Sequence, residues 1–124
     1  MIDIQADKIC CAFNKVSCTE IDPFVQGDPF SGNMTFVERL GNDPMRDIYS
    51  CNQCGSLIMQ QYHRTGGVFC VFDNYNYFPV KSCEQAVGLY NHSLFELKNI
   101  YATSNLSSRV PYFGYEMEDT DYDD

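Results

Sequence analysis

The clearest pattern of apolar and polar positions lies in the middle of the chain. Two β-prone runs, residues 57–62 and 68–72, flank residues 63–67, which end in Gly66-Gly67. Runs rich in β-branched and aromatic residues around a glycine pair are typical of a β-hairpin. The sequence therefore predicts two antiparallel strands joined by a turn at residues 63–67.

Further β-prone segments lie on both sides of this hairpin. Residues 73–76, Asp-Asn-Tyr-Asn, have the composition of a turn, and residues 77–80 then predict a short third strand. Pro79 has no backbone N–H, so it either ends that strand or places it at a sheet edge. Before the hairpin, residues 34–40 fit a strand and a short helix closed by Gly41 equally well.

Helical signals begin at Ser82. Its hydroxyl can cap the first amides of a helix while Gln85, three residues later, reaches back, which is the capping-box pattern. Asn91 can cap a second helix, in which apolar residues recur at spacings of three and four and so share one face. The residues of this face are Leu94, Leu97 and Tyr101.

Together these elements predict an α+β fold. A small antiparallel sheet over residues 56–80 packs with helices over residues 83–101. The length of 124 residues suits a single domain. We expect this domain to span residues 1–115 and an acidic tail to follow at residues 116–124.

The negative net charge disfavours some classes of function. The net charge is −9, of which −6 comes from residues 116–124 and −3 from residues 1–115. Nucleic-acid binding and binding to anionic membranes require clustered Lys and Arg, so both are disfavoured. The aromatic and acidic segment at residues 112–124 is suited to contact a protein partner, because its rings can anchor while its charges stay in solvent.

The compartment is predicted from the N-terminus and from the apolar runs. No run approaches the length of about 20 apolar residues that a membrane-spanning helix needs. Acids occupy the start of the chain, where a signal peptide carries Lys or Arg. We therefore expect an intracellular protein of the cytoplasm or nucleus. Three N-glycosylation sequons, beginning at Asn33, Asn91 and Asn105, keep a secreted protein as the alternative.

Seven cysteines carry the most informative chemistry: Cys10, Cys11, Cys18, Cys51, Cys54, Cys70 and Cys83. Cys51-Asn52-Gln53-Cys54-Gly55 is a CxxC motif followed by glycine. Such a motif forms a tight turn in which both sulfurs and several backbone amides converge, and Gly55 can adopt the positive φ that this turn requires. The sequence therefore predicts a structural zinc knuckle at Cys51 and Cys54.

A tetrahedral zinc site needs two more ligands. Spacing allows two downstream sets, His63 with Cys70 or Cys70 with Cys83, and a helix start would favour the thiolate of Cys83. The three N-terminal cysteines offer a third route. The alternatives are disulfides, redox-active thiols and buried thiols that act as small apolar side chains, the last applying above all to Cys70.

Motifs of common enzymes are missing from the sequence. It has no His-Glu-x-x-His pair, no deaminase pattern, no Gly-x-Ser-x-Gly elbow and no glycine-rich phosphate loop. We therefore expect a non-enzymatic interaction or assembly protein. Its Asn-, Tyr- and Phe-rich composition without Trp resembles that of small virion or accessory proteins of large DNA viruses. The alternatives are a secreted, disulfide-stapled ligand or immune modulator, and a thiol redox protein that uses Cys51 and Cys54.

Overall fold

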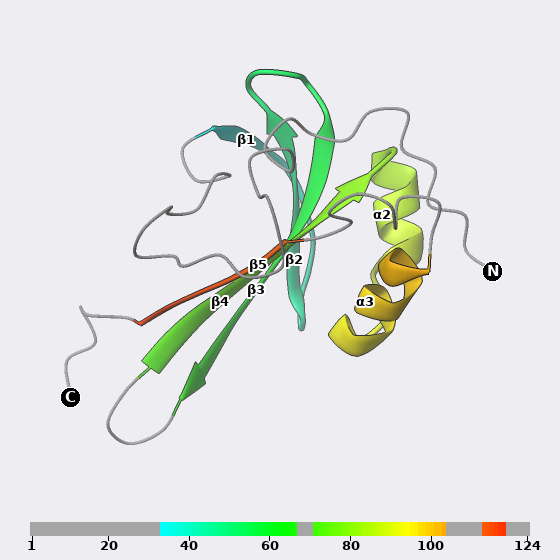
Figure 1. The fold of residues 1–124 in the computed structure, drawn as a ribbon. Coiled ribbons are helices and arrows are strands. Elements are labelled where there is room, and N and C mark those ends of the chain that lie inside the picture. Colours follow the sequence, from blue (N-terminus) through cyan, green and yellow to red (C-terminus); the bar gives the residue numbers. More distant parts are fainter. Residues whose placement is uncertain (1–32, 67–70, 104–112, 119–124) are drawn as a thin grey trace.

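The computed structural model describes residues 33–66, 71–103 and 113–118, which form one antiparallel sheet and two helices (Figure 1). The strands are β1 (Met34–Asn42), β2 (Met45–Cys51), β3 (Leu57–Gly66), β4 (Val71–Val80) and β5 (Phe113–Glu118), and the helices are α2 (Cys83–Leu89) and α3 (Leu94–Ala102). Each strand pairs with its neighbour in the chain, so the sheet order is β1-β2-β3-β4-β5. The predicted α+β fold is confirmed, and the sheet extends beyond residues 56–80 on both sides. Neither helix of the described part is long and apolar enough to cross a membrane.

The predicted hairpin is present, but its strands are longer than expected. β3 continues through His63 to Gly66, and β4 runs without a break through residues 73–76, which the sequence predicted to be a turn. That prediction was wrong because cross-strand bonds use the polar side chains that would otherwise stabilise a turn. Asn74 Nδ2, for example, donates to Thr65 Oγ1 at 2.9 Å.

Asp73 shows the same effect on the other face of the sheet, since successive strand residues alternate between faces. Tyr62 Oη and Arg64 Nε donate to Asp73 Oδ1 at 2.6 and 3.0 Å. The hydrogen bond from the Tyr62 hydroxyl, followed by that from the Arg64 guanidinium, lowers the pKa of Asp73. Because both donors lie on β3, the carboxylate joins β4 to β3 instead of turning the chain.

The other strand predictions are resolved by the pairing of the sheet. Residues 34–40 belong to a strand, β1, and not to a helix. Pro79 lies in β4 beyond the stretch that pairs with β5, so this part of β4 is at an edge of the described sheet, as the sequence allowed. β5 includes residues 116–118, which the sequence assigned to the acidic tail, and residues 119–124 lie outside the described residues.

The main core lies between the sheet and the two helices, which lie on the same side of the sheet (Figure 1). Ile48 of β2 pairs with Met59 of β3, and Met59 pairs with Phe78 of β4, so these three buried side chains form a row across the sheet. Four buried helix residues pack in the same cluster: Ala86 and Leu89 from α2, and Leu97 and Tyr101 from α3. The predicted apolar face of the second helix is therefore confirmed.

Both helices begin after a serine cap. Ser82 Oγ accepts from Gln85 N at 3.1 Å, as predicted, whereas Gln85 Oε1 accepts from Lys81 N at 2.7 Å and not from the amide of Ser82. The cap of α3 is Ser93, so the prediction that Asn91 caps this helix was wrong. Ser93 prevails because the residue three positions later can complete its cap.

That residue is Glu96, and the two side chains form a complete capping box. Ser93 Oγ accepts from Glu96 N at 3.1 Å, and Glu96 Oε1 accepts from Ser93 N at 3.1 Å. These bonds satisfy amides that have no partner within the helix. The hydrogen bond from the Ser93 amide, followed by that from the His92 ring, lowers the pKa of Glu96.

We expect the Glu96 carboxylate to make stability depend on pH in the acid range. Its pKa in the folded chain is lower than the value of about 4.3 in an unfolded chain. The carboxylate therefore stabilises the folded state fully above that value, and its contribution is lost as the pH falls through the folded pKa. Glu96→Gln keeps an oxygen acceptor for the Ser93 amide but does not titrate.

Urea denaturation of the unchanged chain and of Glu96→Gln at about pH 5.5 and about pH 3 measures this contribution. The free energy of unfolding should fall less between the two conditions in Glu96→Gln than in the unchanged chain. Equal losses in the two proteins would contradict a stabilising role for the ionised carboxylate.

Candidate functional site

The CxxC motif forms the tight turn between β2 and β3. Gly55 N donates to Cys51 O at 2.9 Å, and Cys51 N donates to Ser56 O at 2.9 Å, which closes the turn. Gly55 has a φ of +76°, so the positive φ predicted from the sequence is confirmed. A side chain at this position would strain the backbone, which explains why glycine follows the second cysteine.

Polar groups surround both sulfurs of this turn. Gln53 N donates to Cys51 Sγ at 3.4 Å, and Cys54 Sγ donates to Ser56 Oγ at 3.3 Å. Cys51 is buried, and Cys54 is half-buried. A backbone amide that points at a sulfur favours the thiolate, which is the form that binds metal.

The structure brings only some of the predicted ligands toward this turn. Leu57, the first residue of β3, pairs with Val80, so Cys83 at the start of α2 follows the same end of the sheet. His63 lies six positions further along β3, about 20 Å away at the rise of an antiparallel strand. The turn and His63 are therefore not brought together, and Cys70 lies outside the described residues.

Two observations concern the cysteines of the described part as a group. No disulfide joins Cys51, Cys54 and Cys83 to one another, and Cys83 packs against the apolar core cluster. Within residues 33–66, 71–103 and 113–118, no three His, Cys, Asp or Glu side chains form a group that could hold a metal ion. The other candidates, Cys10, Cys11 and Cys18, lie outside these ranges.

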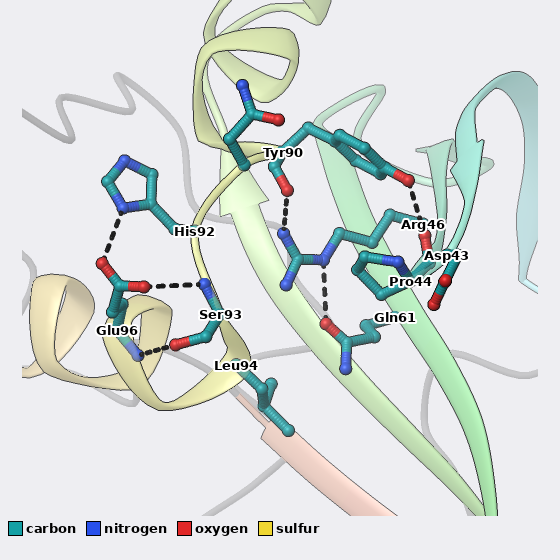
Figure 2. Close-up of a pocket in the computed structure, with 10 residues that line it drawn as sticks. Asp43, Pro44, Arg46, Gln61, Tyr90, His92, Ser93, Leu94 and Glu96 are labelled. Atoms are coloured by element: carbon teal, nitrogen blue, oxygen red, sulfur yellow. Dashed lines mark hydrogen bonds and ion pairs between the residues drawn. The ribbon is translucent and has the colours of Figure 1, made fainter.

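A second candidate site, which the sequence did not predict, lies where α2 meets α3 (Figure 2). It is a cavity of about 400 Å³. Its walls are the β1–β2 turn at residues 43–44, the strand residues Arg46 and Gln61, the connection at residues 90–94, and Glu96.

Arg46 is the central residue of this cavity and is 0% exposed. Its Nε donates to Gln61 Oε1 at 2.8 Å, and its Nη1 donates to Tyr90 O at 2.6 Å and to Leu89 O at 3.4 Å. The two carbonyls lie at the C-terminal end of α2, where the helix dipole is negative and favours a cation. The remaining nitrogen, Nη2, is buried and has no hydrogen-bond partner. Burial lowers the pKa of this guanidinium.

Tyr90 joins the end of α2 to the β1–β2 hairpin. Its hydroxyl donates to Pro44 O at 3.0 Å, and the Arg46 guanidinium lies over its ring at 5.7 Å from the centroid. Gly41 of β1 lies against the same ring so closely that a Cβ there would overlap the Tyr90 hydroxyl. The connection between the helices therefore fits the hairpin only because residue 41 has no side chain.

The polar side chains on the α3 side of the cavity are used to hold the helix start. Glu96 Oε2 lies 3.4 Å from His92 Nδ1, and Glu96 Oε1 accepts from the Ser93 amide. The Ser93 hydroxyl accepts from the Glu96 amide. The serine, histidine and carboxylate thus form a helix cap and not a nucleophile with its base.

The sequence carried one weak signal for Arg46. It lies two residues before Ile48, and residues i and i+2 of a strand share a face. An arginine in phase with a buried isoleucine indicates a buried charge, but only once β2 itself has been assigned. The acceptors of its guanidinium come from β3 and from the end of α2, which local patterns do not connect to it.

Comparison with known proteins adds no assignment: no family model, no curated protein and no solved structure matches this chain.

The close contact between Gly41 and Tyr90 predicts that alanine substitutions at Gly41 and at Gly88 change stability in opposite directions. Gly41→Ala should lower the free energy of unfolding by about 1–3 kcal/mol, because Tyr90 or the hairpin must move. Gly88→Ala in α2 is the matched control, since a Cβ there would meet no atom within 4 Å apart from its chain neighbours and the backbone of its own helix. Gly88→Ala should raise the free energy of unfolding by up to about 1 kcal/mol, because alanine has the higher helix propensity. Urea denaturation measures both, and a neutral Gly41→Ala would show that the junction does not need this close contact.

Proposed function

We propose that this chain is a non-enzymatic interaction or assembly protein whose fold is pinned by a structural zinc ion at Cys51 and Cys54. The observation that carries the zinc proposal is the closed turn, with the Gln53 amide directed at Cys51 Sγ and the positive φ of Gly55. The two thiols of this turn would supply two of the four ligands of a tetrahedral zinc site. The bound ion would stabilise the folded state of a small domain.

The position of β1 supports an N-terminal origin for the remaining ligands. Asn52 lies inside the turn. Its backbone N donates to Asn33 O at 2.8 Å, and its side-chain Oδ1 accepts from Thr35 Oγ1 at 2.6 Å. The chain therefore enters the sheet beside the turn, and the preceding 32 residues contain Cys10, Cys11 and Cys18. This favours the third predicted route over His63, which lies far along β3.

The structural context of the motif favours a metal over a redox dithiol. In thioredoxin-like proteins a CxxC opens a helix, where the dipole activates the first thiol. Here a strand, β3, follows the motif after Gly55 and Ser56. Cys54 Sγ donates to Ser56 Oγ at 3.3 Å, and this thiol would lose its proton on binding the ion.

Exposed apolar side chains support the interaction role. Phe95 on α3 is 75% exposed and Val87 on α2 is 55% exposed, while Phe36 and Val37 are exposed on β1. β1 is an edge strand of the sheet within the described residues, and apolar edge strands are common sites of contact with partners. Within the aromatic and acidic segment at residues 112–124, residues 113–118 form β5, and the acidic residues of the segment add negative charge for a protein partner.

Native mass spectrometry before and after a chelator tests the zinc proposal. We expect one zinc ion per chain, lost together with cooperative folding when the chelator is added. Cys51→Ser should abolish zinc binding and lower the melting temperature. Cys83→Ser is the matched control: it changes a cysteine of the core cluster and should keep the zinc while lowering stability.

Two results would contradict the proposal. If Cys51→Ser leaves the zinc content unchanged, the turn does not bind the ion. A mass lowered by about two hydrogens per bridge and insensitive to the chelator would show disulfides, and the secreted, disulfide-stapled ligand would then be the better hypothesis.

A further inference from the structure

Arg46 differs from the other arginines of the described residues in having no carboxylate partner. Arg39 Nε lies 2.8 Å from Asp47 Oδ1, and Arg64 Nε lies 3.0 Å from Asp73 Oδ1. Both of these arginine side chains are about half exposed. Arg46 is 0% exposed, yet its acceptors are an amide oxygen and two backbone carbonyls.

A buried charge of this kind is unfavourable unless an opposite charge compensates for it. The C-terminal carbonyls of α2 supply only the partial negative charge of a helix end. Two carboxylates border the same cavity, and neither forms an ion pair with Arg46: Asp43, and Glu96, which is already bound to the Ser93 amide and lies against His92. The guanidinium therefore keeps both an uncompensated charge and an unused nitrogen, Nη2.

The unused nitrogen faces the cavity. Figure 2 shows the third nitrogen of Arg46, which carries no dashed line, pointing toward Ser93 and Leu94. These residues form the start of α3, a helix of nine residues whose N-terminal end is the positive end of its dipole. A cavity of about 400 Å³ lies at the lower end of the range of small-ligand pockets.

We propose that this cavity, here called the Arg46 pocket (residues 43–44, Arg46, Gln61, residues 90–94 and Glu96), binds a carboxylate group. The carboxylate would accept from Arg46 Nη2 and supply the missing negative charge, while Leu94 contacts the apolar body of the ligand. Asp43 and Glu96 at the pocket would repel a phosphate dianion more than a carboxylate monoanion.

A carboxylate can come from a small free acid or from the C-terminal residue of a peptide. The cavity volume fits either ligand, and both present the same group to Arg46. This binding site is independent of the proposed zinc ion, because the Arg46 pocket and the Cys51–Cys54 turn share no residue.

NMR spectroscopy of the ¹⁵N-labelled full chain tests the proposal through the arginine Nε–Hε signals. Sodium acetate is titrated against sodium chloride at constant ionic strength. The Arg46 signal should shift and saturate with acetate, while the signals of Arg39 and Arg64 should not, because those side chains already have carboxylate partners. Arg39→Lys, Arg64→Lys and Arg109→Lys identify the other signals, so the assignment needs no variant of buried Arg46.

The controls separate a site from a general effect of anions. Acetamide, which has the shape of acetate without its charge, should leave the Arg46 signal in place. Equal movement of all arginine signals, no saturation, or tighter binding of phosphate than of acetate would overturn the proposal. Glu96→Gln removes a negative charge from the pocket and should raise the acetate affinity at least about twofold at low salt; an unchanged affinity would place the acetate elsewhere.

Short peptides distinguish the two sources of the carboxylate. A peptide with a free C-terminus is compared with the same peptide amidated at that end. Binding of the free acid about tenfold or more tighter than acetate assigns the site to a peptide terminus, whereas equal affinity assigns it to small acids. Equal binding of the free and amidated peptides at Arg46 would contradict carboxylate recognition.

Discussion

The guanidinium of Arg46 is the interaction on which the placement of the helices depends. It projects from β2 on the helix side of the sheet and binds the last carbonyls of α2, while Gln61 of β3 fixes its Nε. Carbonyls at a helix end have no partner within the helix, so a cation that reaches them from the sheet fixes where the helix stops. The sheet and the end of α2 are thereby joined by hydrogen bonds as well as by the apolar core.

The short connection after α2 combines several of these constraints. The Tyr90 carbonyl accepts a hydrogen bond from Arg46, and the Tyr90 hydroxyl donates one to Pro44 O. The Tyr90 ring packs against Gly41. A few residues later, Ser93 and Glu96 cap α3. The Arg46 cation thus binds the negative C-terminal end of α2, and the Glu96 carboxylate binds the positive N-terminal end of α3. Because each charge is used by a helix terminus, the two do not pair with each other, and this leaves Arg46 Nη2 available in the pocket.

Features encoded by neighbouring residues could be predicted from the sequence. The Ser82 cap, the apolar face of the second helix and the positive φ of Gly55 each depend on a few adjacent positions, and all three are present. The strand at residues 73–76 does not follow from local patterns, because the side-chain partners of Asp73 and Asn74 on β3 lie nine or more positions away in the chain. Ser93 and not Asn91 caps the second helix, because Glu96 lies three positions after Ser93 and completes a capping box, whereas Leu94 lies three positions after Asn91.

The two candidate sites also differ in how far their residues lie apart in the sequence. The cysteine turn is a local motif, so its conformation followed from five consecutive residues. The Arg46 pocket joins a hairpin turn, two strands and a helix connection, with partners of Arg46 up to 44 positions away. No local pattern brings those residues together, because their contact requires the sheet register and the packing of both helices.

Hydrogen exchange of the Arg46→Lys variant tests most directly whether this guanidinium holds the helices in place. Lysine keeps the charge but cannot bind the carbonyls of α2 and Gln61 together. If Arg46 holds the helix junction, the amides of α2 and of the start of α3 exchange faster in the variant, while the amides of β3 and β4 keep their protection. Unchanged protection at the helix junction, or an equal loss throughout the chain, would contradict it.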